Sequence, residues 1–280
     1  MRFQRILLVC GAALGAAACS SDTGPTAVND APVASVRFVN AIPDTNKVDI
    51  RFVDQIAGSP YFGQLGFRDI SAYQAVSPGA RHMRIFAVDP AVDAGTANEG
   101  NINVVSQVFV DTTITFEAGK YYTVIQGGYA RAGQSPKQHL IVLTDDRSAV
   151  LSTTQIAVRV VNAAATITSA DVYNGSTATG SALFSGVGYG TASAYKLLST
   201  GTLTFAAAPS GSTTVAASAA APVGAPPASI SQSALGGYSV GGSMLSAFIF
   251  PPSVAGSLAK AATTPGVVWI QDNFPQMPGT

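Results

Sequence analysis

Cysteine is nearly absent from this chain of 280 residues, which contains only Cys10 and Cys19. A chain matured at Cys19 would have no pair of thiols with which to form a disulfide. Charged side chains are also scarce, at 11% of the residues, and 15 basic side chains balance 15 acidic ones. Stability must therefore come from apolar cores. The sequence also lacks the basic cluster that a nucleic-acid-binding surface needs.

Long apolar runs are missing as well, since no stretch reaches the roughly 20 residues that a membrane-spanning helix requires. The run from Ile6 to Ala18 follows two arginines and ends in small residues, which is the pattern of a secretory signal. Cys19 comes next, as in the lipobox of bacterial lipoproteins, in which this thiol is diacylated and becomes the N-terminus. Ordinary cleavage after Ala18, with Cys19 incidental, is the alternative. We expect residues 1–18 to be a signal peptide and Cys19 to carry the lipid.

Lipidation would hold the protein on a membrane, because two or three acyl chains anchor stably. Removal of Arg2 and Arg5 with the signal leaves 13 basic against 15 acidic side chains, a net charge near −2. Residues 19–33, polar and rich in small side chains, would then form the lipidated Cys and a flexible tether. We expect a bacterial envelope location, with the outer membrane favoured over the inner. The protein would face the periplasm or the cell surface.

The remaining chain repeats itself at an offset of 122 residues. Val36-Arg37-Phe38-Val39-Asn40-Ala41 matches Val158-Arg159-Val160-Val161-Asn162-Ala163, and Tyr73 matches Tyr195. Further along, the register slips because loop lengths differ. Solenoid repeats are much shorter than this period. The repeat therefore predicts two domains, 34–147 and 156–274, followed by a tail at 275–280.

Apolar residues alternate with polar ones in both units, for example at Val48, Ile50 and Phe52. Such runs, rich in Val, Ile, Thr, Tyr and Phe, indicate half-buried strands. Gly and Pro turns separate them, as at Ser77-Pro78-Gly79. No helical pattern follows the signal. We predict an all-β protein with two tandem antiparallel β-sandwich domains of immunoglobulin-like size.

The repeat contains polar residues at identical spacing: Arg37, Asn40 and Asp49 recur as Arg159, Asn162 and Asp171. A ligand site is one interpretation. The other is structural, with Asn capping a turn at the strand end and with Arg and Asp paired across neighbouring strands. We favour the structural interpretation, which predicts local bonds and no shared cavity. Tyr73 and Tyr195 are expected to be core aromatics whose hydroxyls bond to backbone.

These same residues resemble a known family. The segment from Val36 to Asp44, Val-Asp-Ile from Val48, and Gly-Lys-Tyr-Tyr-Thr from Gly119 are similar to the DUF4397 domain of bacterial exported proteins and lipoproteins. The resemblance covers nearly all of the first unit. The second unit has Ala-Ala-Thr where the Pro-Asp of the family would stand, so its first turn must differ. The resemblance implies a β-sandwich in the envelope, and it supplies no established activity and no catalytic residues.

Signatures of catalysis are missing from the sequence. The chain has only two histidines, His82 and His139, whereas zinc sites need three or four donors. It has no Gly-x-Ser-x-Gly nucleophile elbow and no phosphate-binding loop. We therefore expect no enzyme activity, no cofactor and no metal site.

The expected function is that of a non-catalytic structural or binding module. A carbohydrate-binding or adhesive surface protein is the first alternative, for which Tyr61, Phe62 and Phe67 are the nearest candidate aromatics. A hydrolase accessory domain is the second alternative. The expected partners are the membrane, through the lipid anchor, and an unidentified envelope protein or glycan. We expect no nucleic-acid partner.

Overall fold

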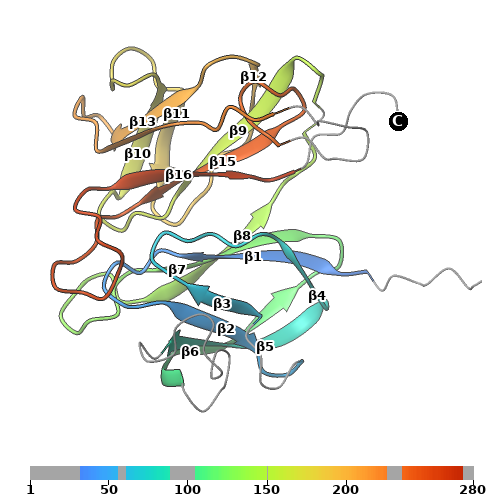
Figure 1. The fold of residues 1–280 in the computed structure, drawn as a ribbon, viewed down its shortest axis with the longest axis vertical. Coiled ribbons are helices and arrows are strands. Elements are labelled where there is room, and N and C mark those ends of the chain that lie inside the picture. The colour runs from blue at the N-terminus through green and yellow to red at the C-terminus, as the bar shows by residue number, and fades with distance from the viewer. Residues whose placement is uncertain (1–31, 56–60, 89–104, 150, 226–234, 274–280) are drawn as a thin grey trace, which may run out of the picture. The chain divides into compact units, whose positions relative to one another are not determined.

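Sixteen strands and no helix occupy the part of the chain that the structure describes (Figure 1). The structure is a computed structural model, and it describes residues 32–55, 61–88, 105–149, 151–225 and 235–273. Cys19, the expected signal peptide and the tether up to residue 31 lie outside the described residues. The described residues therefore contain no helix long and apolar enough to cross a membrane.

The first sandwich contains two four-stranded sheets, β4-β1-β7-β8 and β3-β2-β5-β6. Its strands are β1 (Ala34–Asn40), β2 (Val48–Phe52), β3 (Phe62–Leu65), β4 (Gln74–Val76), β5 (Gly79–Val88), β6 (Val105–Phe116), β7 (Tyr121–Gly127) and β8 (His139–Asp145).

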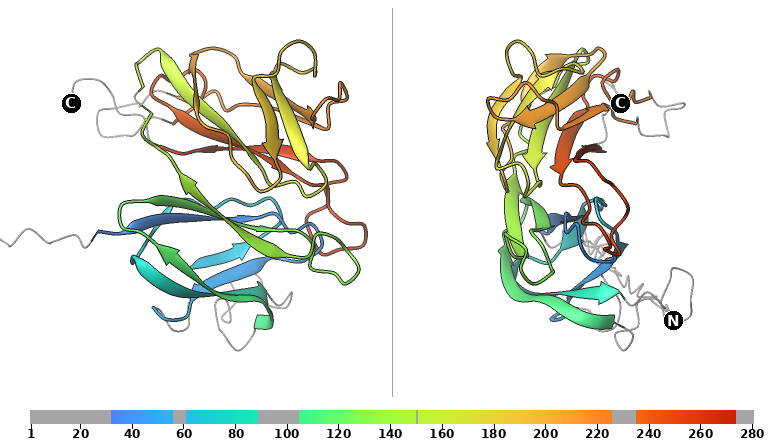
Figure 2. Two further views of the ribbon diagram at one scale, coloured as in Figure 1. Left: turned by 180° about the vertical axis from the view of Figure 1, so that it is seen from behind. Right: turned by 90° about the vertical axis from the view of Figure 1, so that its left-hand side faces the viewer.

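The second sandwich repeats this arrangement with the sheets β12-β9-β15-β16 and β11-β10-β13-β14 (Figure 2). Its strands are β9 (Gln155–Asn162), β10 (Ser169–Asn174), β11 (Phe184–Gly188), β12 (Lys196–Ser199), β13 (Thr204–Pro209), β14 (Ala217–Ala220), β15 (Met244–Phe250) and β16 (Gly266–Gln271). Every strand has a counterpart at the same place in the other sandwich.

The predicted all-β class and the two sandwiches are confirmed. The ladders are antiparallel with one exception in each sandwich: β1 pairs parallel with β7, and β9 pairs parallel with β15. Alternation of apolar residues predicts strands but not their direction, so the sequence pattern could not reveal these parallel pairs.

The first strand of each sandwich is buried on both faces. In β1, Val36 and Phe38 face the core of the first sandwich, while Val39 belongs to an apolar cluster shared with the second sandwich. Successive strand residues point to opposite faces, so Arg37 also lies on the face shared with the second sandwich. This explains why Arg37 is buried although it is charged.

Three apolar clusters hold the fold together. One fills the first sandwich, around Phe38, Phe52 and Phe116. One fills the second sandwich, around Phe205 and Leu245. The third joins the two sandwiches and has the members Val39, Ala41, Ile125, Val161, Ala163, Phe248 and Phe250.

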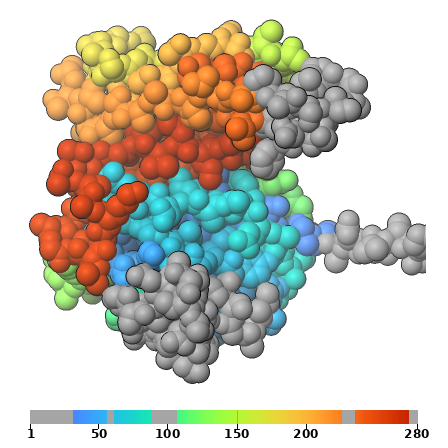
Figure 3. Space-filling model, viewed as in Figure 1, coloured from blue at the N-terminus to red at the C-terminus, as the bar shows by residue number. Residues whose placement is uncertain are grey.

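The segment between β15 and β16 also contacts the first sandwich. The Arg68 guanidinium donates to the carbonyl oxygens of Pro251 (2.6 Å) and Thr264 (2.5 Å), and the Val254 amide donates to the Pro43 carbonyl (2.9 Å). In Figure 3 this segment, in red, lies against the blue and cyan surface of the first sandwich. It therefore reinforces the contact that the third apolar cluster makes.

Candidate functional site

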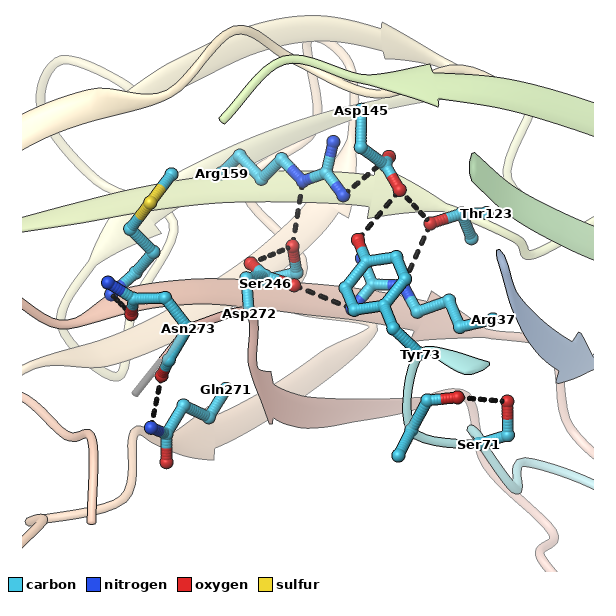
Figure 4. A network of polar contacts seen from close by, with 12 residues as sticks. Arg37, Ser71, Tyr73, Thr123, Asp145, Arg159, Ser246, Gln271, Asp272 and Asn273 are labelled. Carbon is cyan, nitrogen blue, oxygen red and sulfur yellow. Dashed lines mark hydrogen bonds and ion pairs between the residues drawn. The ribbon is translucent and has the colours of Figure 1, made fainter. Parts of the chain in front are cut away.

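A buried polar network lies between the sheet that contains β1 and the sheet that contains β9 (Figure 4). The first sandwich contributes Arg37 from β1, Thr123 from β7 and Asp145 from the end of β8, together with Tyr73. The second contributes the corresponding set, Arg159 from β9, Ser246 from β15, Asp272 directly after β16, and Tyr195. The three residues of each set that lie in or next to the sheet are buried.

Within the first sandwich, Thr123 connects the arginine to the aspartate. The Arg37 Nε donates to Thr123 Oγ1 at 2.8 Å, and this hydroxyl donates to Asp145 Oδ2 at 2.6 Å. The Tyr73 hydroxyl donates to the same carboxylate oxygen at 2.7 Å. Asp145 therefore accepts two hydroxyl hydrogens from its own sandwich.

The second sandwich forms the same set of bonds. The Arg159 Nε donates to Ser246 Oγ at 2.7 Å, and that hydroxyl donates to Asp272 Oδ2 at 2.6 Å. The Tyr195 hydroxyl donates to Asp272 Oδ2 at 2.7 Å. Ser replaces Thr without loss of the bonding pattern.

The ion pairs cross between the sandwiches. Arg37 Nη1 donates to Asp272 Oδ1 at 2.6 Å. Arg159 Nη2 lies 2.7 Å from Asp145 Oδ1, as an ion pair and without the alignment of a hydrogen bond. Each arginine thus binds the aspartate of the other sandwich, so the junction is reciprocal, as in an interface between two identical subunits.

The environment of the junction keeps Arg159 charged and keeps Tyr73 and Tyr195 protonated. Desolvation by burial lowers the pKa of Arg159, but the charge of Asp145 and further negative groups outweigh it and raise that pKa overall, so the guanidinium stays charged. Burial, with the nearby carboxylates, raises the pKa of Tyr73 and of Tyr195 well above the ordinary value, so both hydroxyls remain donors. The Arg37 guanidinium also lies over the Tyr73 ring, 4.7 Å from its centroid.

The junction holds the two sandwiches together through paired charges. Its charges are paired, and breaking a buried pair by removing one partner costs about 3–5 kcal/mol. One edge of it reaches solvent: Arg159 and Tyr195 line a hollow of about 430 Å³ with Thr144, Asp146 and Ser148. Of the repeated residues of the second unit, Arg159 lines this hollow and Asn162 and Asp171 do not, so it is not a cavity that the three share.

The predicted role of the repeated asparagines is confirmed. The Asn40 Oδ1 accepts the Ile42 amide at 3.1 Å and its Nδ2 donates to the Leu65 carbonyl at 2.9 Å, so it closes the turn after β1. Asn162 closes the turn after β9 in the same way, through the Ala164 amide at 3.0 Å. Its Nδ2 donates to two carbonyls, those of Ile167 and Val187.

The predicted pairing of the repeated Arg and Asp residues across neighbouring strands is wrong. Asp49 instead accepts the Gln64 amide at 2.7 Å, and Asp171 accepts the amides of Gly186 and Gly211. The hydrogen bond from Gly186 is the main cause of the lowered pKa of Asp171. These aspartates bond to the edge strands β3 and β11 next to them, and Asp171 also to the turn after β13, whereas the arginines are committed to the junction.

The expectation that Tyr73 and Tyr195 bond to backbone is also wrong, because their hydroxyls bond to carboxylates. The candidate aromatics for glycan binding lie mainly inside the protein: Phe62 and Phe67 are buried, and Tyr61 packs its ring edge against Phe52. They do not form an exposed platform.

His82 contacts residues of its own sandwich, and His139 contacts a tyrosine of the second sandwich. His82 contacts the Asp111 carboxylate, which the Arg84 Nε also reaches at 2.8 Å. The ring of His139 lies edge-on to Tyr189, with centroids 5.8 Å apart. Among the described residues, no group of three or more His, Cys, Asp or Glu side chains could hold a metal ion.

The sequence comparison missed half of the junction. Asp145 and Asp272 are 127 residues apart and Thr123 and Ser246 are 123 apart, so an ungapped repeat at 122 does not align them. A weak signal was present, because both aspartates directly follow an apolar run that ends in a polar residue, Thr144 or Gln271. Aligning the two strand ends would have paired them.

Comparison with known protein families gives a match. No curated protein matches the chain. The model of the family described as "Domain of unknown function (DUF4397)" matches residues 34–173, half of the sequence. The match begins at β1, covers the whole first sandwich and extends through β9 into β10 of the second. The chain therefore belongs to the DUF4397 family.

Proposed function

We propose that this chain is a lipid-anchored, non-catalytic structural or binding module of the bacterial envelope. One observation carries the proposal: the arginines that the repeat retains in both units are buried and paired in the junction between the sandwiches. The charged arginines that the repeat retains, Arg37 and Arg159, therefore serve to hold the two sandwiches together. The lipobox-like segment ending at Cys19 supports the anchor.

The second sandwich is, in this proposal, a divergent second copy of the family domain. The two sandwiches share the order of all their strands, including the unusual parallel pair. Arg37 and Asn40 also occupy the same strand positions as Arg159 and Asn162. One divergence lies in the first turn, where Pro43-Asp44 of the first copy is replaced by Ala165-Thr166.

The anchor is tested by replacing the thiol. Cys19→Ala should abolish labelling of the protein by radioactive palmitate in a bacterial host and should release it from the membrane fraction. Cys10→Ala is the matched control, since it removes the other cysteine from within the expected signal and should leave labelling and location unchanged. A wild-type chain that is exported without label would contradict the proposal.

A further inference from the structure

The two sandwiches differ at one seam, where the edge strands of their two sheets approach each other. In the second sandwich these edge strands are β14 and β16, and Trp269 closes the space between them. Its Nε1 donates to the Ala219 carbonyl at 3.3 Å, and its ring lies 4.5 Å from the ring of Phe205. An indole of this chain thus spans the seam.

The corresponding seam of the first sandwich is open. Between β6 and β8 lies a groove of about 710 Å³, a size typical of ligand sites. Its lining from β6 includes Val110, Thr112 and Ile114, and its lining from β8 includes Leu140 and Val142. The lining also includes Asp111 and His139, and at one end the Gln138 Nε2 donates across the groove to the Phe109 carbonyl at 2.9 Å. Between these residues the walls are neutral, with β-branched and aliphatic side chains.

Strand register identifies the residue that stands where the indole stands in the other copy. Val142 pairs with Val124 in the first sandwich, and Trp269 pairs with Ala247 in the second, at the same step of each ladder. By the same reasoning, Thr112, which pairs with Met83, corresponds to Ala219, which pairs with Phe205. Val142 is too short to cross the seam, and 42% of it is exposed.

The part of the edge strand β6 that borders the groove has no bulge to protect it against pairing, because its two register shifts against β5 lie before Val110 and its pairing from Val110 to Phe116 is regular. In the described residues β6 pairs with β5 on one side only, and it has no Pro or Lys. Its single charge, Asp111, is held by Arg84 on the neighbouring strand. Natural edge strands of this length are normally guarded by charges, Pro or a covering segment.

We propose that the groove between β6 and β8 binds an extended peptide segment of a partner protein, with an aromatic side chain inserted over Val142 and Thr112. The second sandwich supplies the argument for this occupant, because there an aromatic ring on a strand fills the equivalent space and hydrogen-bonds to the equivalent carbonyl. The backbone of the segment would add to the free edge of β6, a common mode of peptide recognition. The neutral walls favour an uncharged segment.

This inference names the binding surface of the proposed module and rests on the proposed binding role, but it does not depend on the lipid. It is tested on the purified full chain carrying Cys19→Ala, so that a failed anchor experiment leaves it untouched. The probe is a capped synthetic peptide with the sequence of residues 266–271, Gly-Val-Val-Trp-Ile-Gln, which fills the seam of the second sandwich. The control probe has Ala in place of Trp.

Isothermal titration should show one binding site, and the Ala peptide should bind at least about tenfold more weakly, because it loses the burial of an aromatic ring. Hydrogen exchange should slow in β6 and β8 on binding. Val142→Trp should fill the groove and abolish binding. Trp269→Val should open the second seam and raise the number of sites from one to two.

Leu197→Trp is the matched control, since it adds an indole at a residue of β12 that is 47% exposed and lies outside the groove. It should bind as the unmodified chain does. Thr112→Lys, which places a charge in the groove, should also abolish binding, and it serves as the blocking variant if Val142→Trp does not fold.

Three results would overturn the proposal. The first is an unmodified chain that does not bind the peptide. The second is undiminished binding by a folded blocking variant. The third is a dimer of the unmodified chain that the blocking variants separate, which would make a second copy of this chain the occupant.

Discussion

The two sandwiches have the same strand order but different interiors. The first has long strands in the sheet that lies away from the junction, with 10 residues in β5 and 12 in β6, and a core rich in phenylalanine. The second has 6 residues in β13 and 4 in β14, and its core contains many alanines beside Phe205 and Trp269. At the junction, by contrast, the two match almost residue for residue. The repeat has retained the face through which the copies dock, while the cores and outer edges differ.

The largest expected effect comes from removing the junction arginines, and it tests whether the two ion pairs contribute equally to the free energy of unfolding. Arg37→Ala and Arg159→Ala should each lower the free energy of unfolding by about 3–5 kcal/mol, because each leaves a buried aspartate without its cation. Urea unfolding of the full chain measures both losses. Arg81→Ala is the control: its pair with Asp54 is partly exposed, so it should cost only about 0–1 kcal/mol.

Equal losses for the two arginines would support the reciprocal junction. A loss for Arg159→Ala that is no greater than the loss for Arg81→Ala would contradict it. A large loss for one arginine alone would mean that the ion pair of 2.6 Å and that of 2.7 Å differ in worth despite their similar geometry.

A smaller effect should distinguish the two asparagines. Asn162→Ala should destabilise the protein by roughly 1 kcal/mol more than Asn40→Ala, since the Nδ2 of Asn162 donates to two carbonyls and that of Asn40 to one. Thermal and urea melts of the two variants provide the comparison. Equal destabilisation would show that the extra bond contributes nothing to stability.

The smallest effect concerns alkaline pH. The pKa of Tyr73 and of Tyr195 is raised in the folded protein, mainly by burial. A raised folded pKa gives stability that is complete below the unfolded value of about 10 and is lost as pH rises from there toward the folded value. The free energy of unfolding should therefore fall by a few tenths of a kcal/mol per tyrosine near pH 10.

Urea unfolding from pH 8 to pH 11 measures this slope, and the variant with Tyr73→Phe and Tyr195→Phe should flatten it. The Phe variant also loses two hydrogen bonds at every pH, so the slope is the relevant quantity. Some slope should remain from Tyr189, whose pKa burial raises to about 12. An unchanged slope in the double variant would exclude the two junction tyrosines as its source.

The strands could be predicted because their information is local. The alternation at Val36 and Phe38, or at Val48 and Ile50, reports directly on a half-buried strand. The turn function of Asn40 was predictable for the same reason, since its partner amide is two residues away. In both cases the residues that determine the structure lie within one short segment of the sequence.

The junction could not be predicted, because its information is distant in the chain. The residue type of Arg37 gives no sign that its partner is Asp272, 235 residues further on. A buried arginine and an exposed one look alike in a sequence of low charge. The same holds for Val142 and Trp269, whose equivalence appears only once the strand register is known.

The two crossing ion pairs are equivalent in space but not along the chain, and this sets the order in which they can form. Asp145 and Arg159 are separated by 14 residues across the link between the sandwiches, so this pair closes a short loop. Arg37 and Asp272 are separated by 235 residues, so their loop costs more entropy to close. During synthesis, which starts at the N-terminus, the pair of Asp145 and Arg159 can form as soon as β9 has been made. Arg37 can bond to Thr123 of its own sandwich before then, but it gains its ion-pair partner only when Asp272, after β16, has been made.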